Sequence, residues 1–222
     1  MAKAYLEPNE VESLEKAATC MRDRLLIRLL SRLGCRISEA LAIALEDIDL
    51  ARGTVTIQHL KTRLKLLCPS CDAKVEEAVA QAREHRKLRT LHLDKDTLER
   101  LRGYINRGGP VSRSGKQIIF GINRHHAWHI VTECARRAGL SPLVNSESGR
   151  ERKVSPHRLR DAFAVMAVQQ DDSTDGVRML QEWLGHANIG TTMRYRKVAG
   201  QELKEWYQKL WSDKGEEQWL NP

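Results

Sequence analysis

The stretch EWLGHANIGTTMRYRKV places a tyrosine among cations, nine residues after a histidine. The tyrosine is Tyr195, the histidine is His186, and the cations are Arg194, Arg196 and Lys197. A tyrosine that only fills a core seldom sits among three cations, because burying those charges without partners is costly. A cluster of cations lowers the pKa of a phenol from its ordinary value of about 10. Tyr195 is therefore either a surface residue or a nucleophile.

Two earlier stretches also carry residues suited to chemistry. GCRISEAL sets Arg36 directly before a predicted helix, with Glu39 one turn along it. SPHRLRDAFA begins with serine and proline, which are favoured at the cap and first turn of a helix. It places His157 and Arg160 three residues apart, on one helix face. Taken singly, each arginine would more simply belong to a surface ion pair.

The spacing of apolar residues predicts a mainly helical chain. Between Asn9 and Leu33 they recur on one face of a helix, and Gly34 breaks the pattern. Stretches rich in Gly, Ser and Pro at 106–116 and 141–153 are predicted to be loops. Further helices are expected at 37–45, 94–106, 124–138, 156–169, 175–184, 188–194 and 200–211.

A small antiparallel sheet is expected beside these helices. Residues 52–60 and 87–94 show the β-branched alternation of strands, and they predict a hairpin with a long insertion at about 62–86. A chain of 222 residues can bury one sizeable core, so residues 1–222 are expected to form a single domain. The predicted fold class is mainly α (α+β), a helical bundle with a small antiparallel β-sheet.

The ordered motifs resemble those of the tyrosine recombinases, also called phage-type integrases. The order is an arginine, a hairpin lysine, His-x-x-Arg, Leu-Gly-His and a tyrosine, and it covers essentially the whole chain. The resemblance implies the catalytic-domain fold of that family. In the family, a tyrosine attacks a DNA phosphodiester, forms a 3′-phosphotyrosyl link and releases a 5′-hydroxyl. A 5′-hydroxyl of a second strand then attacks this link and reseals the DNA.

The resemblance also assigns roles to individual residues. Neither a metal nor a nucleotide cofactor would be needed, because the covalent intermediate stores the bond energy. Two guanidiniums would bind the phosphate oxygens and neutralise their charge. The first histidine would donate to the phosphate or accept a proton, and the second would donate to the same phosphate. Lys61, with Lys65 as the fallback, would protonate the departing 5′-oxygen, and Glu39 would orient its neighbours. The implied catalytic residues are Arg36, Lys61, His157, Arg160, His186 and Tyr195.

The insertion contains half of a zinc knuckle. Cys68 and Cys71 have the Cys-x-x-Cys spacing, but a structural zinc site needs two further ligands. His85 and His92 could supply them only at irregular spacing, and His92 falls in a predicted strand. No metal site is therefore assigned, and a degenerate remnant is the expected interpretation. The five cysteines are odd in number and scattered, which favours reduced thiols over a disulfide framework.

Charge points to a polyanionic partner. The chain carries 37 Lys and Arg against 29 Asp and Glu, a net charge of +8, which favours nucleic acid over a membrane surface. Arg24, Arg28 and Arg32 form a stripe opposite the leucines of their helix, predicted to be solvated or to track a DNA backbone. No apolar stretch approaches the roughly 20 residues that span a bilayer, so a cytoplasmic location is expected.

The expected function is that of a site-specific recombinase or integrase from a mobile element. The implied partners are double-stranded DNA with a specific recombination site, further copies of the chain in a tetramer, and accessory DNA-bending proteins. The C-terminal tail at about 199–222 would dock on a neighbouring copy or on its own domain. The family's N-terminal core-binding domain is absent from the expected organisation. The alternatives are a type IB topoisomerase-like enzyme, a non-catalytic DNA-binding accessory protein and a zinc-binding interaction module.

Overall fold

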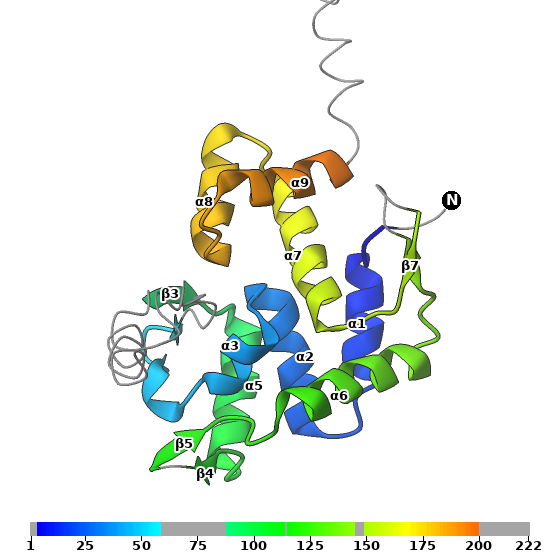
Figure 1. The fold of residues 1–222 in the computed structure, drawn as a ribbon. Coiled ribbons are helices and arrows are strands. Elements are labelled where there is room, and N and C mark those ends of the chain that lie inside the picture. The colour runs from blue at the N-terminus through cyan, green and yellow to red at the C-terminus, as the bar shows by residue number, and fades with distance from the viewer. Residues whose placement is uncertain (1–3, 59–87, 114, 145–148, 200–222) are drawn as a thin grey trace, which may run out of the picture.

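The computed structural model describes residues 4–58, 88–113, 115–144 and 149–199. This part is mainly helical with small antiparallel sheets, as the sequence predicted (Figure 1). The helices are α1 (Pro8–Lys16), α2 (Met21–Leu33), α3 (Ile37–Ala42), α5 (Lys95–Asn106), α6 (Arg124–Arg137), α7 (Pro156–Gln170), α8 (Thr174–Leu184) and α9 (Ile189–Ala199), with a 3-10 turn at Leu45–Asp47. The strands are β1 (Ile48–Asp49), β2 (Thr54–Gln58), β3 (Leu88–His92), β4 (Val111–Arg113), β5 (Lys116–Ile118), β6 (Leu143–Val144) and β7 (Glu151–Arg152).

The predicted helical run from Asn9 to Leu33 is two helices, α1 and α2. Leu14 of α1 and Leu25 of α2 are buried in the same core, so the apolar spacing continues from one helix into the next. The spacing alone therefore could not show where the first helix ends. Gly34 ends α2 in the left-handed region at φ +58°, as a glycine C-cap does. A Cβ there would also clash with Phe163 of α7. Gly34 thus lets α7 approach the end of α2 closely.

The predicted hairpin is confirmed by the antiparallel pairing of β2 with β3. Val55 lies opposite Leu91, and Ile57 lies opposite Arg89. Val55, Ile57 and Leu91 are buried, so this face of the sheet packs on the helical core. β1 adds a short third strand beside β2. The predicted insertion at 62–86 lies outside the described residues.

Two predicted loops contain short strands instead. Residues 106–116 include β4, which pairs with β5, and residues 141–153 include β6 and β7, which pair with each other. These strands are two or three residues long and β4 is fully exposed. They therefore lack the alternation of buried and exposed residues by which a strand is recognised in sequence. Their turn residues made the segments resemble loops.

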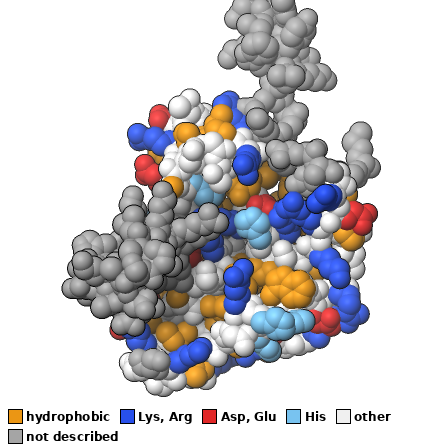
Figure 2. Space-filling model, in the orientation of Figure 1, with side chains coloured by type: hydrophobic (Ala, Val, Ile, Leu, Met, Phe, Trp, Pro, Cys, Tyr) orange, Lys and Arg blue, Asp and Glu red, His pale blue; other side chains and the backbone are white. Residues whose placement is uncertain are grey.

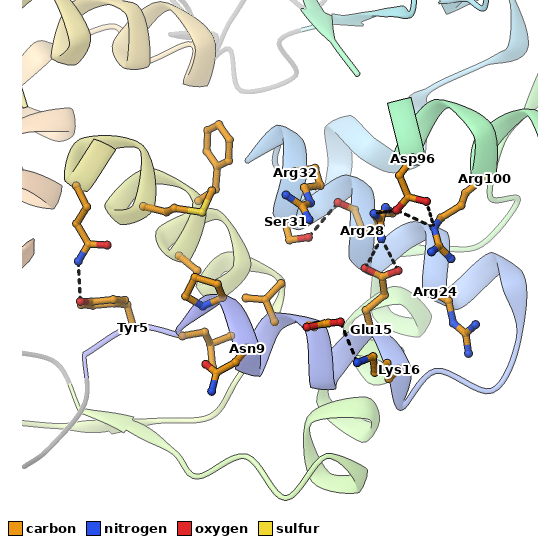
Figure 3. A pocket seen from close by; sticks show the side chains of 18 residues that line it. Tyr5, Asn9, Glu15, Lys16, Arg24, Arg28, Ser31, Arg32, Asp96 and Arg100 are labelled. Carbon is orange, nitrogen blue, oxygen red and sulfur yellow. Dashed lines mark hydrogen bonds and ion pairs between the residues drawn. The ribbon is translucent and has the colours of Figure 1, made fainter. Parts of the chain in front are cut away.

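The predicted arginine stripe on α2 is only partly exposed. Arg28 is buried, and its guanidinium pairs with Glu15 of α1 and Asp96 of α5 (Figure 3). Its Nε also donates to Thr97. A solvated or DNA-tracking role is therefore wrong for Arg28, which joins three helices. The side chains beside it line a cavity of about 720 Å³ between α1, α2, α5 and α7. No predicted catalytic residue is among its described lining residues.

A second apolar cluster fixes the C-terminal helices. Ala164 and Val168 of α7 pack against Leu180 and Leu184 of α8, and Tyr195 of α9 packs on this cluster. In Figure 1, α7 runs from the body of the molecule to the α8 and α9 pair. Within the described residues, no helix is long and apolar enough to cross a membrane.

Candidate active site

Arg160 joins three segments that are distant in the chain. It is 2% exposed on α7, and its Nη1 donates to the Gly34 carbonyl at 2.6 Å. Its Nη2 donates to the Leu184 carbonyl and to Nε2 of His186, each at 2.9 Å. Burial, and then repulsion from Arg36, lowers the pKa of Arg160, yet an arginine stays charged at neutral pH. The site therefore holds a fixed cation whose partners here are neutral.

Glu39 holds two guanidiniums together. It is 1% exposed and accepts from the backbone nitrogen of Arg36 at 2.9 Å and from its Nη1 at 2.8 Å. It also accepts from Nη2 of Arg89 on β3 at 2.7 Å. Burial alone would raise the pKa of Glu39, but the hydrogen bonds from Arg89 and Arg36 outweigh it and lower the pKa. Glu39 thus stays ionised and orients Arg36, in the role that the resemblance implied for it.

His186 is held in one tautomer by its neighbours. An arginine can only donate, so Nε2 of His186 accepts from Arg160. The ring proton therefore lies on Nδ1, which is 2.9 Å from Oγ1 of Thr192. Burial, and then the positive charge of Arg160, lowers the pKa of His186 to about 4. The histidine is therefore neutral at pH 7. Its Nε2 carries no proton in this tautomer, so it could donate to a phosphate, as the resemblance implied, only after gaining one.

Tyr195 lies in an environment opposite to the one that its sequence neighbours suggest. Burial, and then the carboxylate of Asp161, raises its pKa to about 12. The prediction that a cluster of cations around Tyr195 lowers this pKa is wrong. Residues adjacent on a helix do not face one another, so Arg194 is exposed and Arg196 turns to Asp172, at 3.8 Å. The phenol hydroxyl instead donates to Oδ1 of Asp161 at 3.1 Å, and its ring stacks near His186, with centroids 6.2 Å apart.

A basic cavity of about 430 Å³ opens beside these residues. The N-terminal ends of α6 and α7 contribute to it, and helix N-termini favour anions. Burial raises the pKa of the lining Cys35 thiol to about 12, which leaves it unreactive at pH 7. Lys and Arg side chains are spread over the face in Figure 2, with fewer acidic ones between them. The described lining residues include no acid and are Cys35, Arg36, Ile37, Ser38, Arg124, Pro156, His157 and Arg160.

A family model described as the phage integrase family matches residues 4–202. The chain belongs to the phage integrase family. The resemblance seen in the motifs is thereby confirmed, and it covers the elements that carry Arg36, Arg160 and Tyr195.

Curated members of the phage integrase family show moderate identity to the chain. It is 30% identical over 207 residues to tyrosine recombinase XerD of Mycobacterium leprae, covering 91% of this chain and 56% of that one. It is 27% identical over 190 residues to tyrosine recombinase XerA of Pyrococcus furiosus, covering 83% and 53%. The chain thus spans about half the length of the curated relatives it matches.

Solved structures confirm the predicted fold of a phage integrase catalytic domain. The crystal structure of XerA recombinase has a TM-score of 0.65 at 19% identity, covering 94% of this chain and 64% of that one. The catalytic domain of bacteriophage HP1 integrase has a TM-score of 0.56 at 18% identity, covering 93% and 94%. The second likeness extends over nearly the whole of both chains, so the fold shared is that of the catalytic domain.

The described part of the chain brings the predicted residues that lie in it together around one centre. Arg36, His157 and Arg160 line the cavity, His186 contacts Arg160, and Tyr195 stacks beside His186. Lys61 and Lys65 lie outside the described residues, as do Cys68, Cys71 and His85. His92 lies in β3, as predicted, with its side chain exposed. Among the described residues, no group of three metal-ligating side chains is close enough to hold an ion.

Three residues of the site were missed by the sequence analysis. Asp161 follows His157 by one helical turn, so the spacing that linked His157 with Arg160 could have included it. Arg158 pairs with Asp161 at 2.7 Å. Arg89 gave no signal, because its partner Glu39 is fifty residues away in the chain and on another element.

Proposed function

We propose that this chain supplies the catalytic centre of a site-specific DNA recombinase or integrase. Cleavage and rejoining of duplex DNA would proceed through a 3′-phosphotyrosyl intermediate formed by Tyr195. The observation that carries the proposal is the meeting of Tyr195, His186 and Arg160 beside a cavity whose described lining residues include no acid. A phenol, two guanidiniums and a pocket for an anion are the parts needed for phosphoryl transfer to tyrosine.

The described contacts support a role for each residue. Arg36 and Arg160 would bind the non-bridging phosphate oxygens, since each presents a cation to the cavity. Their permanent charge would stabilise the transition state, and no step calls on a metal ion. His157, also at the cavity, would donate to the phosphate. His186 would hold Arg160 in place, and Lys61 would protonate the departing 5′-oxygen.

Duplex DNA and further copies of the chain are the proposed partners. The net charge of +8 favours a polyanion. Among the structural neighbours, XerH site-specific recombinase was solved bound to its palindromic difH substrate, and lambda integrase as a tetramer bound to a Holliday junction. These complexes support the proposal that this chain binds DNA and assembles on it.

A covalent selection tests the proposal on duplexes of many sequences at once. Nicked duplexes with randomised arms would be incubated with the chain, denatured, and scored for DNA that remains attached to protein. We expect attached DNA with the wild type in EDTA, and none with Tyr195→Phe. Failure of the wild type to capture any duplex, or capture by Tyr195→Phe, would contradict the assignment of Tyr195.

The captured sequence then separates the alternatives. Exchange of strands between two duplexes that carry it would identify a recombinase. Relaxation of a supercoiled plasmid without exchange would identify a type IB topoisomerase-like enzyme. If no duplex is captured, DNA binding without an adduct would identify a non-catalytic accessory protein.

A further inference from the structure

Asp161 is positioned on the reacting oxygen of Tyr195. The two residues lie on α7 and α9, and the phenol hydroxyl donates to Oδ1 of Asp161 at 3.1 Å. The other carboxylate oxygen, Oδ2, forms an ion pair with Nη1 of Arg158 at 2.7 Å. The Asp161 side chain is only 14% exposed. Both of its oxygens are therefore engaged, and Arg158 fixes the direction in which Oδ1 points.

An acceptor for the phenolic proton is needed at this site. With the pKa of Tyr195 raised to about 12, only on the order of one molecule in 10⁵ carries a phenolate at pH 7. Nucleophilic attack must then begin from the neutral phenol, with the proton leaving as the new bond forms. A group already hydrogen-bonded to the hydroxyl is placed to take that proton.

The two histidines are less well placed for this task. Nε2 of His186 already accepts from Arg160, and its Nδ1 faces Thr192. His157 lines the phosphate cavity, with its Nε2 3.8 Å from Oδ1 of Asp161. Among the described residues, Asp161 is the hydrogen-bond acceptor of the Tyr195 hydroxyl.

We propose that Asp161 is a catalytic residue, the general base for Tyr195. As Oη of Tyr195 bonds to phosphorus, its proton passes to Oδ1 of Asp161. The bond from phosphorus to the 5′-oxygen breaks, and that oxygen takes a proton from the general acid assigned to Lys61. On religation, the 5′-hydroxyl returns its proton to the lysine as it attacks. The proton on Asp161 then returns to Oη as the phosphotyrosyl bond breaks.

This inference rests on the proposed function and is tested with Asp161→Asn. Asparagine keeps the shape and the accepting oxygen, but it cannot take the proton. We expect single-turnover adduct formation to slow by about 10²- to 10⁴-fold. Binding to the captured duplex should be unchanged, and Asp161→Glu should recover part of the rate. The matched control is Asp172→Asn, which removes the exposed carboxylate that pairs with Arg196 of α9, and it should cleave like the wild type.

A sulfur substitution separates the general base from the general acid. In a duplex with sulfur in place of the bridging 5′-oxygen, the leaving group needs no proton. This duplex should restore cleavage by Lys61→Ala and leave Asp161→Asn slow. Placing the more acidic 3,5-difluorotyrosine at position 195 should reduce the factor by which Asp161→Asn slows adduct formation.

A rate of adduct formation that does not fall in Asp161→Asn would overturn the inference. If Asp161→Asn forms the adduct as fast as the wild type or faster, the hydrogen bond only restrains the nucleophile. Rescue of Asp161→Asn by the sulfur duplex would also contradict the role, because it would place Asp161 on the leaving group. Failure of the wild type to form any adduct would instead contradict the proposed function.

Discussion

Arg89 donates to Glu39 at 2.7 Å, and through this carboxylate β3 is connected to Arg36. The pair is largely buried, with the Glu39 side chain at 0% and that of Arg89 at 13% exposure. Removing one member of such a pair leaves a buried charge with too few partners. The strand that ends the hairpin is therefore coupled to one of the proposed phosphate-binding cations.

Arg89→Ala should lower the free energy of unfolding by about 3 kcal/mol, because Glu39 loses its buried ion pair with Arg89 at 2.7 Å. Urea denaturation measures this change, and the cleavage rate should fall as Arg36 loses its fixed orientation. Arg52→Ala is the matched control, since Arg52 is 85% exposed and 3.7 Å from Asp49. Equal losses in the two variants would mean that burial of the pair is unimportant.

Gly34→Ala should destabilise the protein more than Gly108→Ala. Both glycines have positive φ, at +58° and +73°, so each alanine incurs about 1–2 kcal/mol of backbone strain. Around Gly108 nothing lies within 4 Å of an added Cβ, whereas at Gly34 it would clash with Phe163. Overpacking should add about 1–3 kcal/mol at Gly34. Equal melting temperatures for the two variants would contradict the prediction that an added Cβ at position 34 clashes with Phe163.

Arg36→Ala and Arg160→Ala should both abolish detectable cleavage but differ in stability. Arg160 is 2% exposed and bonds to two backbone carbonyls, so its loss should reduce the free energy of unfolding by about 3 kcal/mol. Arg36 is 24% exposed and leaves Glu39 still paired with Arg89, so its loss should cost less. Thermal unfolding beside the adduct assay separates the two effects. Cleavage by Arg36→Ala at the wild-type rate would exclude it from the site.

His186 should make stability depend on pH. Its pKa is about 4 in the folded chain and about 6.5 when unfolded, so the unfolded chain binds the extra proton between these values. The contribution of neutral His186 to the free energy of unfolding is complete above about pH 6.5 and is lost as the pH falls towards 4. Urea midpoints over this window should slope less in His186→Gln than in the wild type. A slope in His186→Gln that matches the wild type would contradict the prediction.

The sequence predicted which residues would lie together better than it predicted their environments. The ordered motifs pointed to Arg160, His186 and Tyr195 through the resemblance to the family, and helices α7 and α9, which carry Arg160 and Tyr195, followed from apolar periodicity. The pKa of Tyr195 was predicted in the wrong direction, because burial and then the carboxylate of Asp161, on another helix, raise it. Charges adjacent in sequence are a poor guide on a helix, where neighbours point in different directions.

Long-range pairs explain the remaining gaps in the prediction. The partners of Arg28 lie on α1 and α5, so its burial could not be read from a stripe on α2. The short strands β4 to β7 carry no periodic signal, because pairing with a neighbour defines them. A single sequence reports local preference, whereas these features depend on which segments meet.

Position 34 is constrained in three independent ways. Its φ is left-handed, its missing Cβ admits Phe163, and its carbonyl receives Arg160. A smaller residue at position 163 would relieve the crowding but leave the backbone strain. In evolutionary terms, no single compensating substitution opens a path away from glycine at this position.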